Sequence, residues 1–219
     1  MSSNKVEKVV YFVRHGQSED NILPVFQSTD PKLSDEGRRQ AACLAGRASA
    51  LDFNVLLTSP YPRAKETAEL IGQAVGKVPE ESALFVERVK PTELNGRLYS
   101  DEEALSLYRS WHESFHVSGL RVKDGENFAD LVSRIDAGLE LLQNRPEQAI
   151  LVVTHGYFLR SLIARVVLGS ELTPESFKQF QNVLVVENTG LTILRYEAAF
   201  DESPTWRLWI YNDHTHLGE

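Results

Sequence analysis

The sequence predicts a three-layer α/β/α fold, with helices on both faces of a mostly parallel sheet that carries an antiparallel edge strand. Short apolar runs alternate with segments of helical periodicity along most of the 219 residues, which is typical of parallel strands joined by crossover helices. The strand-like runs are almost continuously apolar, as expected for strands that are covered on both faces. The last runs follow one another closely, which predicts the antiparallel addition.

The elements of the first half follow in chain order. An apolar run over 9–13 predicts the first strand. The segment 34–51 predicts an amphipathic helix, because a serine can cap it, acidic residues occupy its first turn, and apolar residues recur at helical spacing. A second strand is predicted over 54–59, and Pro62 begins a second helix, since proline is tolerated in a first turn. A third strand is predicted over 82–86.

The second half continues the alternation and then ends in strands. Helical periodicity predicts three helices, over 101–115, 127–145 and 156–169. The clearest buried strand, 149–155, separates the last two helices. Late strands are predicted over 182–187, 190–196 and 206–211, with a turn at 188–190.

The length and composition fit one folded unit. With 42% hydrophobic residues, the chain can bury a sizeable core. No segment is repetitive or rich enough in Pro, Gly or Ser to act as a linker. We therefore expect a single domain over 1–219, with the least regular stretch, around 88–125, forming a lid or insertion.

The charge and the cysteine content limit the partners and the location. The formal net charge is −8, and an acidic surface repels nucleic acid and anionic membranes, so neither is an expected partner. No apolar run approaches the ~18 residues that span a bilayer, and "MSSNKVEK" does not resemble a signal segment. Cys43 is the single cysteine, so no internal disulfide can form. We expect a cytoplasmic protein with a reduced thiol; the oligomeric state stays open.

Charged and imidazole side chains follow three of the predicted strands where each strand ends. "FVRHGQSEDN" places Arg14 and His15 after the first strand, and "LLTSPYPRAKETA" places Arg63 past the second. "LVVTHGYFLRS" places His155 at the end of the buried strand. Because α/β proteins bind ligands beyond the carboxyl ends of their strands, we expect these side chains to converge on one pocket. Forked arginine donors, helix N-termini and glycine backbone suit a dianionic phosphoryl group.

The segments "RHGQSEDN", "TSPYPRAKETA" and "VTHGYFLRSLI" closely resemble motifs of the histidine phosphatase superfamily. This group contains cofactor-dependent phosphoglycerate mutase and the fructose-2,6-bisphosphatase domain. The resemblance covers most of the chain, with "GENFADLVSRI", "NTGLT" and "NDHTHL" as further matches. It implies phosphoryl transfer through a phosphohistidine, without a metal or another cofactor.

The resemblance also implies a role for each site residue. His15 would be the nucleophile that takes the phosphoryl group. The phosphoryl oxygens would be held by Arg14, Asn21, Arg63 and His155. A histidine must be neutral to attack, so we expect the neighbouring arginine cations to lower the pKa of His15. Its other ring nitrogen needs an acceptor that fixes the tautomer, and the sequence leaves this acceptor open.

The leaving oxygen needs a proton, which a glutamate supplies in the family. The chain offers Glu87 and Glu93, and we predict Glu87, because it directly follows the strand predicted over 82–86. The alternative interpretation of Glu93 is a solvated loop carboxylate. The common family continuation, Gly-x-Trp-Glu-Gly, is absent, which leaves the lid geometry and the substrate open. In its place the chain carries Arg88, Lys90, Pro91 and Gly96.

A competing motif is "HESFH", which matches the zinc-protease signature His-Glu-x-x-His at His112 and His116. On a helix both histidines would share one face, but a catalytic zinc usually needs a third protein ligand. Glu126, the candidate third ligand, lies closer to His116 in the sequence than in a thermolysin-like site, and no third histidine has the metzincin spacing. We therefore favour a lid helix whose aromatic residues provide packing: Tyr108, Trp111 and Phe115.

The function predicted from these residues is hydrolysis of a small phosphorylated metabolite, that is, a phosphomonoester hydrolase. One alternative is a cofactor-dependent phosphoglycerate mutase, and another is a catalytically idle relative that binds a phosphorylated ligand. The chain contains no P-loop, no Gly-x-Gly-x-x-Gly fingerprint and no Gly-x-Ser-x-Gly elbow, which argues against nucleotide-binding and α/β-hydrolase activities.

Overall fold

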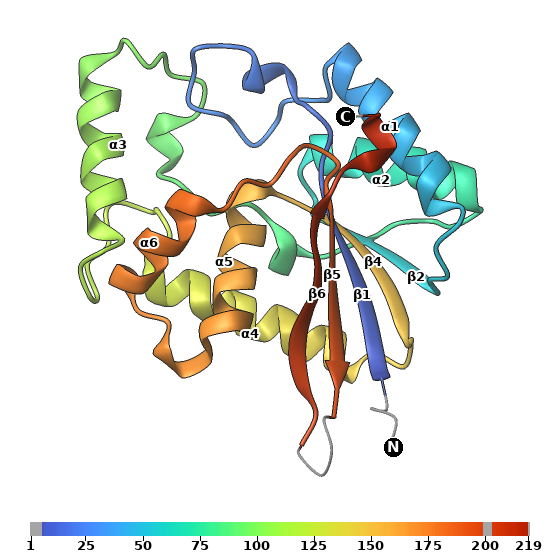
Figure 1. The fold of residues 1–219 in the computed structure, drawn as a ribbon. Helices are drawn as coiled ribbons and strands as arrows, with labels where there is room; N and C mark the ends of the chain where they lie inside the picture. The colour runs from blue at the N-terminus through green and yellow to red at the C-terminus, as the bar shows by residue number, and fades with distance from the viewer. Residues whose placement is uncertain (1–5, 199–202, 219) are drawn as a thin grey trace.

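A computed structural model describes residues 6–198 and 203–218, and its core is a six-stranded sheet of order β3-β2-β4-β1-β5-β6 (Figure 1). The strands are β1 (Val6–Arg14), β2 (Val55–Thr58), β3 (Glu80–Glu81), β4 (Ala149–Thr154), β5 (Leu191–Glu197) and β6 (Thr205–Asp213). Strands β1 to β4 are mutually parallel, whereas β5 is antiparallel to β1 and β6 is antiparallel to β5. The mostly parallel sheet is confirmed, and its antiparallel part holds two strands instead of a single edge strand.

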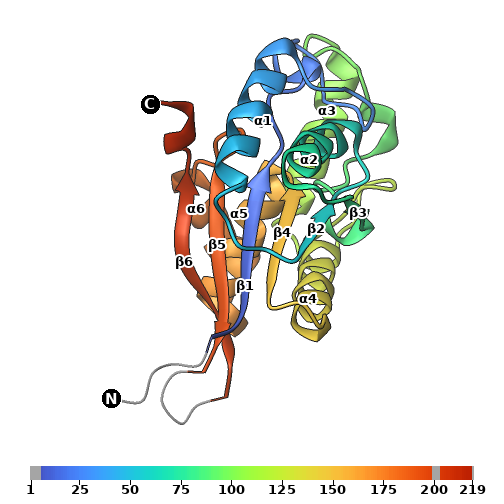
Figure 2. The same ribbon diagram turned by 90° about the vertical axis from the view of Figure 1, so that its right-hand side faces the viewer.

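Helices cover both faces of the sheet, as predicted. Helices α1 and α2 lie on one face; α4 and α5 lie on the other, with α6 beside α5, and α3 stands beyond the sheet (Figures 1 and 2). The bounds are α1 (Asp35–Ala48), α2 (Pro62–Val75), α3 (Glu102–Ser114), α4 (Phe128–Asn144), α5 (Gly156–Leu168) and α6 (Pro174–Val183). Within 6–198 and 203–218, none of the helices is both long and apolar enough to cross a bilayer.

Two large apolar clusters form the core, one on each face of the sheet, and a small third cluster joins Phe26, Leu94 and Ala104. In β4, Ile150 and Val152 belong to the cluster under α4 and α5, whereas Leu151 and Val153 belong to the cluster under α1 and α2. Both faces of this strand are therefore buried, which explains why its sequence is continuously apolar and does not alternate.

The strand predicted over 82–86 is wrong. Residues Ala83–Phe85 form the 3-10 turn η2, in which the Ser82 hydroxyl accepts the backbone N–H of Leu84 and tightens the chain. Phe85 is fully buried in the core, so the segment is apolar because the turn packs inward. The strand that pairs with β2 lies earlier, at the exposed pair Glu80–Glu81.

The strand predicted over 182–187 is also wrong, and helix α6 was not predicted. Thr173 caps this helix by accepting the N–H of Ser176, and Pro174 occupies its first turn. The helix continues to Val183, and the chain up to the turn at 188–190 is irregular. The apolar pattern of this segment is typical of a strand, but Val183 and Val185 face solvent and are 76% and 61% exposed.

The carboxyl ends of β1, β2 and β4 lie at one edge of the sheet. Arg14 at the end of β1 pairs with Thr154, and Thr58 at the end of β2 pairs with Val153. Helices α2 and α5 begin directly beyond these ends, so their N-termini point to the same space (Figure 2). The segment 88–125, with α3 and the 3-10 turn η3 (Thr92–Leu94), lies beyond this edge.

Candidate active site

The three strand ends bring four of the predicted site residues together. Arg63, in the first turn of α2, donates from Nε to Nε2 of His15 at 3.2 Å. The rings of His15 and His155 are 5.0 Å apart between centroids in an edge-to-face arrangement. Arg14 lies against the start of α5: a Cβ on Gly156 would be 3.2 Å from Arg14 Nε. The predicted convergence of these residues is thus a feature of the structure.

The tautomer of His15 is fixed by its own neighbour in the chain. His15 Nδ1 lies 2.6 Å from the carbonyl oxygen of Gly16. A carbonyl can only accept, so Nδ1 carries the proton and Nε2 keeps its lone pair. The acceptor that the sequence left open is therefore the Gly16 backbone. Asn188 holds the residue from the other side, because its Nδ2 donates to the His15 carbonyl at 2.8 Å.

Burial is the main reason why His15 is neutral. The side chain is 2% exposed, and desolvation lowers the pKa of His15 well below its ordinary value. The cations of Arg63 and then Arg14 lower this pKa further. The sequence predicted that the two arginines would lower the pKa of His15. The structure shows that burial lowers it more than either arginine does. The pKa of His155 is lowered in the same way, by burial first and by Arg63 second.

Gly16 and Gly37 allow the strand end to approach the first turn of α1. A Cβ on Gly16 would lie 2.5 Å from the Gly37 carbonyl oxygen, and a Cβ on Gly37 would lie 1.9 Å from the Gln17 carbonyl oxygen. Neither position can therefore hold a side chain without a backbone shift. The Gly16 N–H donates to Thr67 Oγ1 at 3.1 Å, which ties the same loop to α2.

Two of the predicted site residues at this edge each carry a buried polar atom without a protein partner among the described residues. His155 Nε2 is hydrogen-bonded to Ser59 Oγ at 2.8 Å, which leaves Nδ1 of the same ring unsatisfied. Arg14 donates from one terminal nitrogen to the Val186 carbonyl at 2.6 Å, whereas its Nε is also unsatisfied. Neither atom meets a partner in the part of the chain that the structure describes. Such groups are costly unless a ligand satisfies them.

Asn21 lies at the rim of the site and not in its centre. It belongs to the 3-10 turn η1 (Glu19–Asn21), and its residue is exposed. Its Oδ1 accepts from the backbone N–H and the hydroxyl of Ser18, at 2.9 and 3.0 Å. The side chain nevertheless lines the same cavity as Arg14 and Arg63.

The structure separates the two candidate acids. Glu87 lines the cavity, and its carboxylate accepts the backbone N–H groups of Phe158, Arg88 and Tyr157 at 2.9, 3.0 and 3.2 Å. It therefore sits at the N-terminus of α5. Glu93 lies outside this cavity, is half exposed and forms an ion pair with Lys123 at 3.2 Å. Its position agrees with the alternative interpretation, a solvated loop carboxylate.

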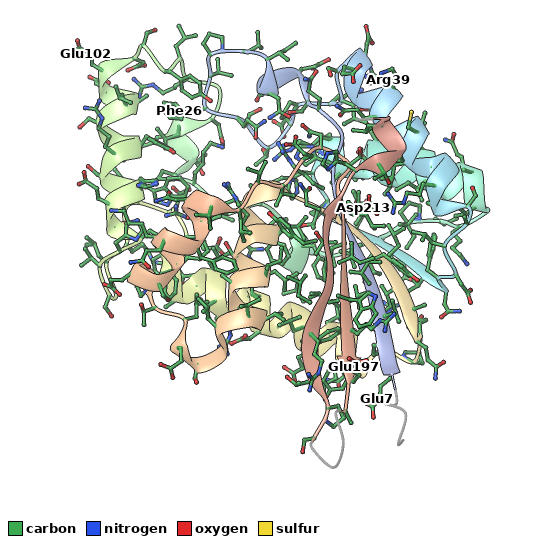
Figure 3. The ribbon with its side chains drawn as sticks, viewed as in Figure 1. Glu7, Phe26, Arg39, Glu102, Glu197 and Asp213 are labelled. Atoms are coloured by element: carbon green, nitrogen blue, oxygen red, sulfur yellow. The ribbon has the colours of Figure 1, made fainter. Side chains whose placement is uncertain are left out.

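The cavity above the strand ends has a volume of about 910 Å³. Arg14, Arg63 and Glu87 line it, while His15 and His155 lie behind them. The opposite wall is aromatic and comes partly from the segment 88–125. Phe26 reaches toward α3 from the N-terminal loop (Figure 3), and its ring packs against two others of this wall, Tyr99 and Tyr108.

The two histidines of the His-Glu-x-x-His pattern do not share a helix. Helix α3 ends at Ser114, so His112 is helical and His116 follows in a turn. Their ring centroids are 5.7 Å apart. Across residues 6–198 and 203–218, no three His, Cys, Asp or Glu side chains are grouped so as to hold a metal ion. The aromatic neighbours Trp111 and Phe115 are buried, as the lid-helix interpretation expects.

Sequence reasoning missed residues that support the site by contacting the His15–Gly16 backbone from a distant part of the chain. Asn188 lies outside the three motifs and Thr67 lies inside the second, but neither contact was expected. The "NTGLT" segment that contains Asn188 was a signal for the first, but no pattern indicated which atom it would hold. Ser59 stands inside a quoted motif, yet its bond to His155 depends on the pairing of β2 with β4.

Comparisons with known proteins agree with this geometry. The family model described as histidine phosphatase superfamily (branch 1) matches residues 10–209. Proteins of several Escherichia coli strains named "Probable phosphoglycerate mutase GpmB" are 28% identical over 95% of this chain and 94% of their own length. Two solved structures have a similar fold. The alpha-ribazole phosphatase of Shigella flexneri has a TM-score of 0.75 at 21% identity, covering 94% of this chain and 96% of that one. A phosphoserine phosphatase of Entamoeba histolytica, solved with phosphoserine, has a TM-score of 0.74 at 22% identity, covering 96% and 99%.

Proposed function

Since this chain belongs to the histidine phosphatase superfamily, we propose that it hydrolyses phosphomonoesters through a phosphohistidine formed on His15. The observation that supports this most strongly is that hydrogen bonds to both ring nitrogens fix the orientation of the His15 imidazole. Its Nδ1 proton is bound to the Gly16 carbonyl, and its Nε2 lone pair faces Arg63. This is the arrangement that a neutral histidine nucleophile needs.

In the first step, the Nε2 lone pair of His15 attacks phosphorus and the ester P–O bond breaks. Arg14, Arg63 and His155 donate to the phosphoryl oxygens, and the unsatisfied Arg14 Nε and His155 Nδ1 support this assignment. These donors act on charge that spreads over the oxygens in the transition state. Asn21 completes the set from the rim. Arg63 Nε must leave Nε2 of His15 and take a phosphoryl oxygen as its new acceptor.

The leaving oxygen takes its proton from Glu87, which enters the step as the neutral acid. The resulting carboxylate then removes a proton from a water molecule, which attacks phosphorus. The P–N bond breaks, inorganic phosphate leaves, and His15 and Glu87 return to their starting forms. This sequence uses neither a metal nor another cofactor.

Water is the favoured acceptor because the cavity is large. A volume of about 910 Å³ corresponds to roughly thirty water molecules of about 30 Å³ each. A three-carbon phosphate ester fills only a small part of this space, so water retains access to the phosphohistidine unless 88–125 closes as the proposed lid. A mutase must instead exclude water while its intermediate turns over. The likeness to the GpmB proteins favours this second candidate, a phosphoglycerate mutase.

The proposed substrate class is a small phosphorylated metabolite. The names of the similar solved structures include phosphatases acting on phosphoserine and alpha-ribazole phosphate, and this range of substrates supports the class without selecting a member. The single cysteine, Cys43, is free, which supports a reducing, cytoplasmic location.

Chemical quench during turnover tests the proposal. The wild type, stopped in acid or base, should carry a base-stable, acid-labile phosphate on the peptide that contains His15. His15→Ala should lose both the label and the turnover, whereas His214→Ala should keep both. Label on another peptide, or full activity of His15→Ala, contradicts the assignment. Primed conversion of 3-phosphoglycerate to 2-phosphoglycerate that outpaces phosphate release would make the enzyme a mutase.

A further inference from the structure

The cavity is rich in cations although the chain is acidic. Arginine and lysine side chains outnumber carboxylates on its wall, while the formal net charge of the chain is −8. The cations are Arg14, Arg63, Arg88, Lys90 and Arg160, and the carboxylates are Asp20 and Glu87. Within 6–198 and 203–218, none of these cations forms an ion pair with a carboxylate. The wall therefore carries uncompensated positive charge.

Neither carboxylate of the wall neutralises these cations by direct contact. Both oxygens of Glu87 accept backbone N–H groups at the start of α5. Asp20 uses Oδ2 to accept the N–H and the hydroxyl of Ser28, at 2.8 and 3.2 Å. An anionic ligand is thus the natural partner of the remaining positive charge.

Three of the five cations already have a role. Arg14 and Arg63 serve the phosphoryl group in the proposed function. Arg88 is enclosed by rings: its guanidinium carbon lies 3.7 Å from the Trp111 centroid and 3.9 Å from the Phe115 centroid. Cation–π contacts of this kind stabilise a buried charge without a carboxylate. Lys90 and Arg160 are left.

Both side chains have donors that no protein group uses, since Nε of Arg160 is buried without a partner in the described part of the chain, but Lys90 is the one that lies beside both Arg63 and Glu87. Its ammonium donates to the Gln27 carbonyl, and since an ammonium has three N–H groups, two remain for a ligand. The guanidinium carbon of Arg160 lies over the Tyr157 ring, 5.5 Å from its centroid. The charged groups around Lys90 are Arg63 on α2, Glu87 on its own segment and Asp20 on η1. Burial, followed by the charge of Arg63, lowers the pKa of Lys90 to about 8, against the opposite pull of Glu87 and Asp20.

We propose that Lys90 is a specificity-determining residue that selects phosphomonoesters with a second anionic group. This inference rests on the proposed function and names the substrate class for the same site. The phosphoryl group is held at Arg14 and Arg63, and the second anion, a carboxylate or another phosphate, is bound by the free N–H groups of Lys90. The alternative role of Lys90 is structural: it clasps the loop at Gln27 to the start of the 88–125 segment.

Two matched substrate pairs test the inference. 3-Phosphoglycerate and glycerol 3-phosphate differ by a carboxylate, and the bisphosphate and monophosphate of propane-1,3-diol differ by a phosphate. In the wild type, kcat/KM should be about 10- to 100-fold higher for the anionic member of at least one pair, mainly through KM, because a bond to a charged group contributes this much. The pair that responds identifies the second anion.

Three variants distinguish recognition of the second anion by Lys90 from a purely structural role of this residue. Lys90→Met should reduce the preference to near unity, Lys90→Arg should retain most of it, and Lys123→Met, in the same segment but outside the cavity, should keep the wild-type ratio. A clasp alone would slow both members of a pair equally. Between pH 7 and 9 the wild-type ratio should fall as Lys90 loses its proton, while the ratio of Lys90→Arg should stay flat.

The outcomes are distinct. A wild-type ratio near unity for both pairs, or a ratio unchanged in Lys90→Met, overturns the inference and leaves the hydrolase standing. If Arg160→Gln loses the kcat/KM preference for the second anion and Lys90→Met retains it, the subsite lies at Arg160 and not at Lys90. Absence of phosphate release from every substrate contradicts the proposed function itself.

Discussion

Replacing Arg63 by glutamine would remove the guanidinium that donates to Nε2 of His15, the nitrogen that we propose attacks phosphorus. The arginine is 2% exposed and donates from Nε to His15 Nε2 at 3.2 Å and from a terminal nitrogen to the Ser28 carbonyl at 3.3 Å. In the proposed mechanism, Nε and the remaining free N–H groups bind the phosphoryl oxygens. Arg63→Gln therefore removes both a donor in the transition state and a cation next to the nucleophile.

The expected loss follows from these two effects. One preorganised donor to developing charge contributes about 2.7–4 kcal/mol, or roughly a hundredfold to a thousandfold in rate. In addition, the charge of Arg63 lowers the pKa of His15, after burial and ahead of Arg14. Without it, this pKa rises toward the ordinary value. Because only the unprotonated imidazole attacks, the acid limb of kcat/KM should move to higher pH, and the loss should be greater at pH 6 than at pH 8.

Hydrolysis of p-nitrophenyl phosphate is the suitable assay, because its leaving phenolate needs little protonation and the rate then depends on the phosphoryl site. Lys65→Gln is a matched control, since Lys65 is an exposed cation on the same helix and pairs with Glu81 at 2.7 Å; it should behave as the wild type. A thermal melt checks that both variants are folded. A fall in kcat/KM of less than about threefold, or an acid limb that stays in place, would refute the reasoning.

Two further predictions concern the leaving group and metal. Glu87→Gln should cost about 10²–10⁴ in rate on an alkyl phosphate and far less on p-nitrophenyl phosphate, whereas Glu93→Gln should show no such dependence; equal losses on both esters in Glu87→Gln, with a lower melting temperature, would indicate a structural role. EDTA should leave the rate almost unchanged, and His112→Ala and His116→Ala should keep most of the activity; stoichiometric zinc together with inactivation by the chelator would revive the "HESFH" hypothesis.

Strands with both faces buried were predictable from sequence, and irregular apolar segments were not. The run 149–153 has no polar position that could face solvent, so a buried strand is the interpretation that fits it. The segment 182–187 contains a similar apolar run over 183–186, but Val183 ends α6, Val185 is exposed, and Val186 packs into the core from an irregular stretch. Composition alone does not distinguish these cases, because the difference is whether a neighbouring strand is present to pair with the segment.

In the site, too, some positions were predictable from sequence and others were not. Arg14, His15, Arg63 and His155 were expected to meet because strand ends of a parallel sheet share one edge. Glu87 was expected to follow a strand and instead follows the η2 turn, yet it still reaches the cavity. The bonds of Asn188 to the His15 carbonyl and of the Gly16 N–H to Thr67 join distant segments, and no local pattern encodes such contacts. The roles of all these residues remain predictions that the experiments above address.

The position of β1 has a consequence for how the molecule assembles. This strand is near the beginning of the chain but central in the sheet, where its neighbours are β4 and β5. Asn188, which holds the His15 carbonyl, comes 173 residues later than His15, and the next residue, Thr189, is hydrogen-bonded to His216. Such long-range pairing gives a high contact order and slow folding. During synthesis, His15 emerges among the first residues and is positioned among the last, so a nascent chain that ends before β5 cannot hold it in place.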